Sequence, residues 1–305
     1  MQGLNLPELW RKLALNKEAK RGTTDSIFDD AQTSLADVLD NVEFNRLQSV
    51  LVLFEQALTF GSLIQVPTDK TEFLHGLKNQ CQTLIEQGDS FQKSAAAALL
   101  PLVKQAWLLA QLYDVVVANP PYMGSKGMNP ELKVFAQKHF PDSKSDLFAM
   151  FIERGLAWCT PNGFNSMVTM QSWMFLSSYE SIREKLLRER TLSCMVHMGN
   201  GVMGIAFGTA ATIFQNQHIN NFVGSFSYCV NDDLNELGIP AQFPVQNERL
   251  KTAKPDDFKK IPGSPIAYWG SSNILKALES SKKLGEIADA RMGLATGNNA
   301  KYVRL

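Results

Sequence analysis

Residues 114–124 read DVVVANPPYMG, a β-branched apolar run that ends in Asn119, Pro120, Pro121 and Tyr122. A run of valines is typical of a strand. Most strands end in a turn of Gly, Asn or Asp, which reverses the chain at little cost. Two consecutive prolines give a stiffer ending, because proline fixes its own backbone and has no N–H group. This stretch therefore predicts a strand that ends in a rigid polar segment.

Strands alternate with helices in the chain that follows. We expect strands over 115–118, 164–170, 193–198 and 209–214, helices over 146–158 and 177–190, and a turn at 160–163. Continuous Val, Met and Ala without polar alternation suit strands that are covered on both faces. The pattern predicts an α/β fold with a Rossmann-like, doubly wound sheet.

The segments on either side of these strands and helices have different sequence patterns. Residues 1–112 are expected to be helical, with breaks at Gly61, Pro67 and Pro101, because apolar residues recur there at helical spacing. The catalytic core is expected over 113–217. Residues 218–270 are rich in Pro, Asn and Asp and predict a loop-rich extension, and 271–305 are expected to begin a further region.

Composition excludes several classes of protein. Lys plus Arg equal Asp plus Glu, at 30 each, so contact with nucleic acid would need a local basic patch. The four cysteines form no C-x-x-C pair and the four histidines no H-E-x-x-H, so we expect no metal site, no disulfide framework and a reducing cytoplasm. The most apolar segment, 94–117, is interrupted by Pro101, Lys104 and Gln105, and no signal peptide precedes it, so no membrane is expected.

The segment Asn119–Tyr122 has a specific chemical capacity. Ligands of open α/β sheets lie beyond the carboxyl ends of the strands, where Asn119 is expected. The Asn119 side chain and the carbonyls beside the prolines are hydrogen-bond acceptors, which suit an amino group with two hydrogens. Tyr122 offers a flat face for a planar ring, a contact worth ~1–3 kcal/mol per base. The alternative is that Asn-Pro-Pro only ends the strand.

These residues also carry a family resemblance. DVVVANPPY resembles motif IV of the amino-methyltransferases, and residues 113–128 and 144–176 are similar to adenine-specific DNA methyltransferases of the Eco57I-like and PglX (BREX phage-defence) type. Residues 19–30, 60–67 and 292–299 also look like that family. The resemblance implies a site-specific DNA adenine N6-methyltransferase component that acts on double-stranded DNA, alone or with other defence-system subunits.

The resemblance also implies roles for single residues. The target adenine is flipped out of the duplex, and the methyl group of S-adenosylmethionine passes directly to N6. Asn119 and the Pro120 carbonyl would accept from N6, beside Pro121, and Tyr122 would stack on the base. Asp146 and Phe148 would line the methyl-donor pocket. Phe207 would close the other face of the base, and Lys126 would contact a phosphate, unless it is an ordinary solvated lysine.

One expected feature is missing. Family members carry a glycine-rich donor loop ahead of motif IV, but residues 1–112 hold no G-x-G. Residues 199–204 do spell G-x-G-x-x-G after an expected strand. We interpret them as a glycine-rich loop beside the base pocket, the alternative being a dinucleotide fingerprint. We expect the chain to bind S-adenosylmethionine weakly or not at all unless another polypeptide supplies the missing half.

Two other functions stay open. A glutamine amide presents the same two hydrogens as adenine N6, so a protein glutamine methyltransferase is one alternative. A non-catalytic DNA-binding or assembly subunit is the other, because the donor loop is missing. His197 is expected to be a satisfied core histidine. Arg183, Lys185, Arg188 and Arg190 are expected on the solvated face of a helix.

Overall fold

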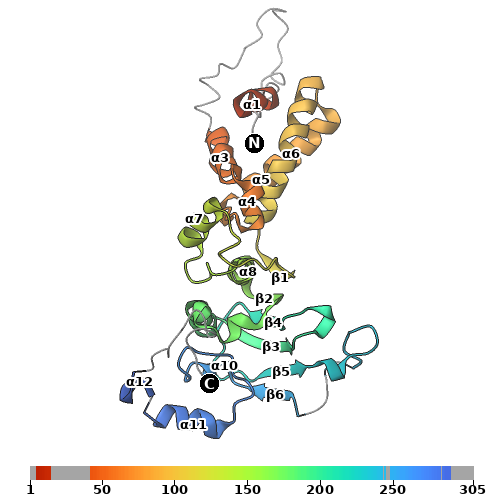
Figure 1. Ribbon diagram of the computed structural model, residues 1–305. Coiled ribbons are helices and arrows are strands. Elements are labelled where there is room, and N and C mark those ends of the chain that lie inside the picture. The colour runs from red at the N-terminus through yellow and green to blue at the C-terminus, as the bar shows by residue number, and fades with distance from the viewer. Residues whose placement is uncertain (1–4, 15–41, 243, 245–247, 283, 290–305) are drawn as a thin grey trace, which may run out of the picture. The chain divides into compact units, whose positions relative to one another are not determined.

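The computed structural model describes residues 5–14, 42–242, 244, 248–282 and 284–289 (Figure 1). The chain divides into two compact units, Met1–Met167 and Val168–Leu305, and the division falls inside strand β2 (Cys159–Met170). The predictions made for 19–30 and 292–299 lie outside the described residues.

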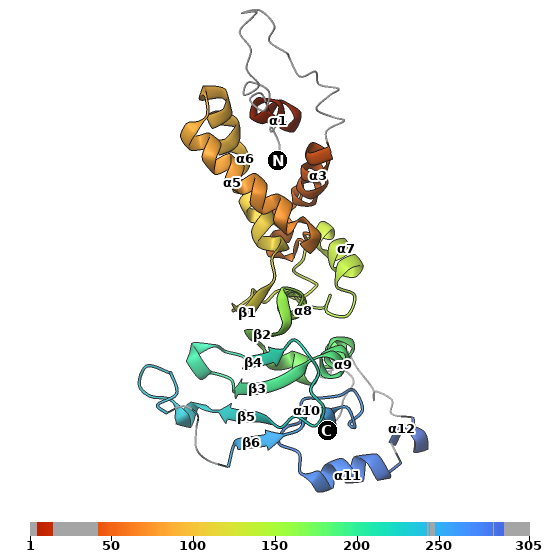
Figure 2. The same ribbon diagram turned by 180° about the vertical axis from the view of Figure 1, so that it is seen from behind.

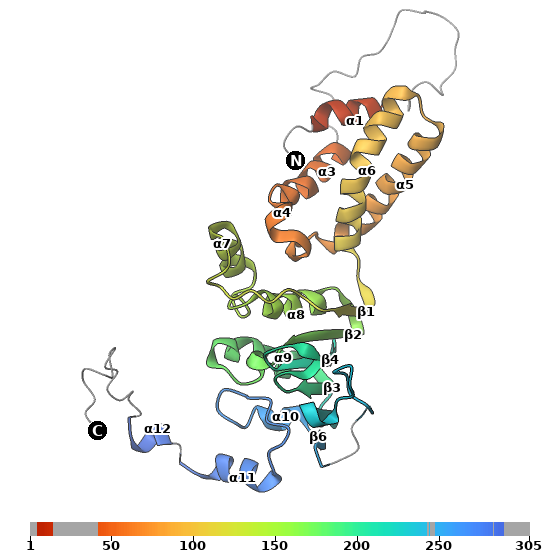
Figure 3. The ribbon, with the colours of Figure 1, turned by 45° about the vertical axis from the view of Figure 1, so that its right-hand side comes forward.

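Helices make up most of the described residues between 5 and 110, where the sequence predicts a helical segment. They are α1 (Leu6–Ala14), α3 (Val42–Leu51), α4 (Ala57–Phe60), α5 (Thr71–Gln87) and α6 (Ser90–Ala110). Figure 3 shows α5 alongside α6, with α1 and α3 next to them. Their shared core includes Phe44, Leu47, Leu74, Leu99 and Val103, all fully buried.

The predicted break at Pro101 is wrong, because helix α6 runs through it. It begins with a capping box, in which Asp89 accepts from the backbone of Gln92 while the Gln92 side chain accepts from Asp89, and it continues through Pro101. Proline inside a helix costs a backbone hydrogen bond. Here the buried residues Leu99 and Val103 lie on either side of Pro101, so packing of the apolar face holds the helix together across it.

A parallel strand pair completes the first unit. Strand β1 (Tyr113–Ala118) pairs with β2, and α7 (Pro130–His139) and α8 (Leu147–Ala157) lie between them in the chain. The predicted turn at 160–163 is a bulge within β2, since the register steps from Tyr113↔Cys159 to Val115↔Phe164. Asn162 takes a left-handed backbone there, with φ of 68°.

Strand β1 is less covered than its sequence predicts. Its side chains at Val115 and Val117 are 55% and 74% exposed. The expectation of a strand covered on both faces is therefore wrong for β1, which lies at the sheet edge. A run of valines fits a half-covered edge strand as well as a central one, so composition alone does not distinguish them.

In the described part of the second unit, strands β4, β3, β5 and β6 lie side by side in that order (Figure 2). They are β3 (Thr191–Met198), β4 (Thr209–Gln215), β5 (Gly224–Cys229) and β6 (Leu250–Ala253), and its helices are α9 (Glu180–Glu189), α10 (Pro255–Phe258), α11 (Ser272–Ser280) and α12 (Leu284–Ile287). Strands β3 and β5 are parallel, while β4 and β6 run antiparallel to their neighbours. The predicted strands and the α/β class are confirmed, and β5 and β6 lie where the sequence suggested loops.

Helix α9 buries an arginine that was expected in solvent. Arg183 is 1% exposed, and its guanidinium donates to the carbonyls of Gly263, Trp173 and Leu176. The fork of N–H donors explains the burial, because it satisfies several backbone carbonyls at once. Arg188, in contrast, is exposed as predicted. No helix in the described part of the chain is long and apolar enough to span a bilayer.

Candidate active site

Motif IV stands at the end of β1. Asn119 follows Ala118 directly and is exposed, Pro120 is buried, and Tyr122 is half-buried. The Tyr122 hydroxyl donates to Oδ1 of Asn119 at 3.3 Å. This bond orients the Asn119 carboxamide and uses one of the two lone pairs of its oxygen. The rings of Tyr122 and Phe148 pack edge to face, with centroids 5.9 Å apart and ring planes at 85°.

Asp146 fixes the chain just after the motif. Its Oδ1 accepts from the backbone N–H of Met123 at 2.9 Å and of Phe148 at 3.2 Å. The side chain is therefore both the N-cap of α8 and a tie to the motif loop. Burial raises the pKa of Asp146, and the hydrogen bonds from Met123 and Phe148 partly offset that rise.

Backbone bonds strengthen the same tie. Leu147 donates to the Met123 carbonyl at 3.1 Å and Ser125 donates to the Ser145 carbonyl at 3.0 Å, which makes a short antiparallel bridge. The motif loop is thereby held to the first turn of α8 by side chain and backbone together. This role of Asp146 was not predicted from the sequence. The available signal was an aspartate directly before an apolar helical run, which is typical of an N-cap.

Lys126 and Phe207 are the two remaining candidates. Lys126 is exposed in the loop after the motif and forms no ion pair within the described residues. Phe207 belongs to the second unit, is 40% exposed and precedes β4. The structure brings together Asn119, Tyr122, Asp146 and Phe148, whereas the roles of Lys126 and Phe207 stay predictions.

Comparison with known proteins identifies the family. Residues 37–203, more than half of the chain, match the family model of the Eco57I restriction-modification methylase. The chain belongs to this methylase family. It is 44% identical over 286 residues to the adenine-specific methyltransferase BrxX of Escherichia coli O9:H4 (strain HS). The aligned region covers 92% of this chain and 23% of BrxX.

Two further similarities complete the comparison. The adenine-specific methyltransferase PglX of Lacticaseibacillus casei (strain Zhang) is 35% identical over 280 residues, covering 89% of this chain and 22% of PglX. A solved chain of a type I R-M system is 14% identical to this chain, with a TM-score of 0.41. The aligned region covers 82% of this chain and 67% of the solved chain. This chain thus spans less than a quarter of the length of BrxX or PglX.

The glycine-rich loop at residues 199–204 is not a dinucleotide fingerprint. It joins β3 to the antiparallel β4, with Met198 opposite Thr209, and contains a single 3-10 turn, Val202–Gly204. A dinucleotide fingerprint instead opens an α-helix within a parallel βαβ unit. Gly201 and Gly204 have φ of 87° and 73°, so this loop needs glycine for its backbone shape.

Proposed function

We propose that this chain is part of a site-specific DNA adenine N6-methyltransferase that modifies double-stranded DNA in phage defence. The observation that carries the proposal is the placement of Asn119, Pro120, Pro121 and Tyr122 at the carboxyl end of β1, with the loop behind them tied to α8 by Asp146. The names of BrxX and PglX, both adenine-specific methyltransferases, support the choice of adenine.

The chain's own residues would hold and polarise the target amine. The free lone pair of Asn119 Oδ1 and the Pro120 carbonyl accept the two N6 hydrogens. Pro121 has no N–H group, so it cannot form a hydrogen bond that would occupy a carbonyl needed as acceptor for the target amine. Accepting both hydrogens leaves electron density on N6. N6 would form the new N–C bond as the bond between the methyl group and the donor's sulfur breaks, and the proton that N6 then loses would pass to solvent. Tyr122 stacks on one face of the flipped base, and Lys126 contacts a phosphate.

The methyl group comes from S-adenosylmethionine in this proposal, which supplies it as an electrophile bonded to sulfur. The residues predicted to contact this donor do not form a complete site by themselves. Asp146 is 6% exposed and its carboxylate is engaged by backbone N–H groups, while Phe148 is fully buried. We therefore assign Asp146 and Phe148 to positioning the motif, and contact with the donor to other residues.

The test is incorporation of tritiated methyl groups from S-adenosylmethionine into mixed-sequence plasmid DNA. The assay compares this chain alone with the longer protein that includes the upstream reading frame. We expect incorporation with the longer protein, and a loss of about 100-fold or more in Asn119→Ala, because stabilising contacts to the reacting group are removed. Asn119→Asp keeps the acceptors and should retain part of the activity.

The control is Asn129→Ala, because Asn129 is an exposed asparagine that caps α7 and is not part of the motif. Full activity of Asn119→Ala would contradict the proposed role of the motif. DNA binding without incorporation in any form of the protein would instead support the second candidate, a non-catalytic assembly subunit, which the missing donor loop favours. Labelling of a protein glutamine rather than DNA would indicate a protein glutamine methyltransferase, the third candidate.

A further inference from the structure

Two lysines of the first unit lie on either side of one hydrogen bond in the loop after the motif. Ser125 donates its backbone N–H to the Ser145 carbonyl at 3.0 Å. Lys126 directly follows the donor residue, and Lys144 directly precedes the acceptor residue. Because consecutive Cα atoms are ~3.8 Å apart, the two side chains start from neighbouring points of the backbone, although they are far apart in the sequence.

Each lysine belongs to a tight turn. The turn 124–127, which contains Lys126, is closed by a backbone hydrogen bond of 2.9 Å between its end residues, and the turn 143–146, which contains Lys144, by one of 3.5 Å. The backbone N–H of Met123, directly after the motif, donates at 2.9 Å to the side chain that ends the second turn. The backbone positions of both lysines are therefore fixed relative to the motif.

Both ammonium groups are available to an anion. Lys126 and Lys144 are exposed, and neither forms an ion pair with another described residue. The carboxylate of Asp146, in the same turn as Lys144, is 6% exposed and accepts from backbone N–H groups. It therefore compensates neither lysine by an ion pair.

The surrounding segment is a local excess of positive charge, which contact with nucleic acid requires in a chain of zero net charge. Residues 124–145 contain four exposed lysines against two carboxylates, namely Lys126, Lys133, Lys138 and Lys144 against Glu131 and Asp142. At the end of α9, in contrast, Glu189 forms ion pairs with Arg188 and Arg190. The uncompensated cations thus lie in the unit that carries the motif.

We propose that Lys144 acts with Lys126 as a phosphate-binding pair for the DNA strand that carries the target adenine. This inference rests on the proposed function and deepens it, because it names a second residue for the contact with the DNA backbone. A flipped nucleotide rotates about its backbone, so its flanking phosphates stay next to the base that the motif holds. Two neighbouring ammonium groups repel each other, and a phosphate between them offsets that repulsion.

The salt dependence of DNA binding tests the pair in the longer protein, with a fluorescent mixed-sequence duplex as the probe. Each lost phosphate contact lowers the slope of log affinity against log salt by about 0.9. We expect that change in Lys144→Gln and in Lys126→Gln, about twice that change in the double variant, and the wild-type slope in Lys144→Arg. Lys104→Gln in α6 is the control, because Lys104 is also an exposed lysine of the first unit.

A neutral phosphate analogue locates the contact. The target adenine is found by sequencing the methylated plasmid, and a methylphosphonate then replaces the phosphate on either side of it. We expect this duplex to raise the KM for DNA several-fold in the wild type and not in the double variant, with KM for S-adenosylmethionine unchanged.

Three results would overturn the inference: an unchanged slope in Lys144→Gln, an equal loss in Lys104→Gln, or a methylphosphonate effect that persists in the double variant. If the wild type modifies no DNA, the proposed function fails, while the salt slopes still decide whether Lys126 and Lys144 bind phosphate.

Discussion

Arg154 joins three segments of the first unit without a carboxylate partner in the described chain. Its guanidinium donates to the carbonyls of Ser62 at 3.2 Å and Ile64 at 2.6 Å, and it lies 4.2 Å from the centre of the Trp158 ring. Leu109, near the end of α6, accepts from Arg154 at 3.4 Å and from Trp158 at 3.2 Å. Burial lowers the pKa of Arg154 to about 10, so the side chain stays charged at pH 7.

We expect Arg154→Met to lower the free energy of unfolding by about 2–4 kcal/mol, because buried carbonyls of Ser62 and Ile64 lose their donor. Arg188→Met is the control, since the Arg188 side chain is 66% exposed. It should change stability by less than about 0.5 kcal/mol. Urea unfolding followed by tryptophan fluorescence measures both, and equal effects of the two substitutions would contradict the role of Arg154.

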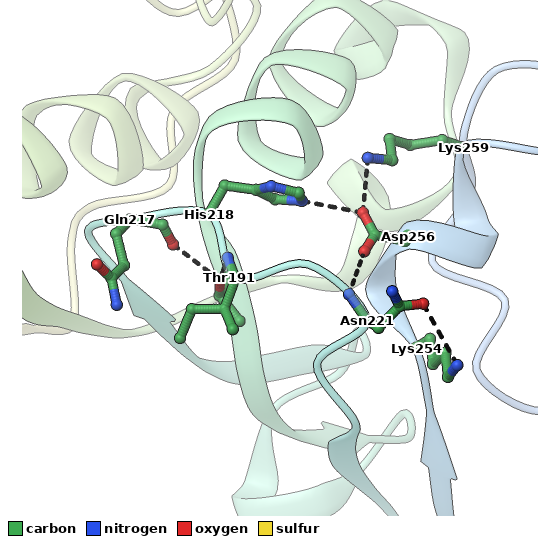
Figure 4. Close-up of polar contacts among 8 residues, drawn as sticks. Thr191, Gln217, His218, Asn221, Lys254, Asp256 and Lys259 are labelled. Carbon is green, nitrogen blue, oxygen red and sulfur yellow. Dashed lines mark hydrogen bonds and ion pairs between the residues drawn. The ribbon is translucent and has the colours of Figure 1, made fainter.

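Asp256 ties α10 to the loop between β4 and β5 in the second unit. Figure 4 shows its carboxylate between His218, Lys259 and Asn221, which donate at 2.9, 2.6 and 3.0 Å. Burial favours a higher pKa, but hydrogen bonds from Lys259, His218 and Asn221 outweigh it and lower the pKa of Asp256 to about 2.

A lowered pKa makes the Asp256 contribution depend on pH. The folded state holds the proton less tightly than the unfolded state, so the stabilisation is complete well above pH 4 and is lost as the pH falls towards 2. We expect the stability difference between wild type and Asp256→Asn, from urea midpoints at pH 6, 4 and 3, to shrink at each step. A difference that is constant with pH would show that the charge of Asp256 contributes nothing.

At the scale of elements, α8 lies close to β2 because of one glycine. A Cβ atom on Gly155 would lie 2.5 Å from Cε of Met167 and 2.7 Å from Oδ1 of Asn165. Asn165 cannot move freely, since its side chain is buried and its Nδ2 donates to the Ile152 carbonyl at 3.1 Å. The close approach therefore fixes how α8 presents Asp146 to the motif loop.

We expect Gly155→Ala to lower the melting temperature, even though alanine favours a helix interior by about 1 kcal/mol over glycine. The matched control is Gly76→Ala in α5, where no atom lies within 4 Å of the added Cβ. That substitution should stabilise the chain by about 0.5–1 kcal/mol. Thermal unfolding by circular dichroism compares the two, and a stabilising Gly155→Ala would exclude tight packing at this position.

Local patterns predicted the elements that are regular and missed those that depend on distant contacts. Strands β1 to β4 have strong apolar runs, whereas β5 reads GSFSYC and β6 only LKTA, which are too short and polar to stand out. The placement of Asn119 after a strand followed from sequence. The tie from Asp146 to Met123 joins residues 23 positions apart, and the burial of Arg183 depends on Gly263, so neither could be predicted from neighbouring residues.

At the scale of the whole molecule, the exposed valines of β1 bear on the proposed donor site. Val115 and Val117 leave an apolar strand face in contact with solvent at the sheet edge, directly before the motif. The chain has no G-x-G ahead of the motif and spans less than a quarter of its curated relatives. We infer that a segment carrying the donor loop covers this face in the longer protein.

The test combines titration with one substitution on that face. We expect isothermal titration to show a micromolar S-adenosylmethionine site in the longer protein and none in this chain alone. Val117→Lys should leave unfolding of the isolated chain within about 0.5 kcal/mol, as for an exposed side chain, but weaken donor binding by the longer protein. Val134→Lys in α7 is the control, since Val134 is also an exposed valine, at 65%. A micromolar site on the isolated chain would contradict the inference, because the donor site would then be complete without any covering segment.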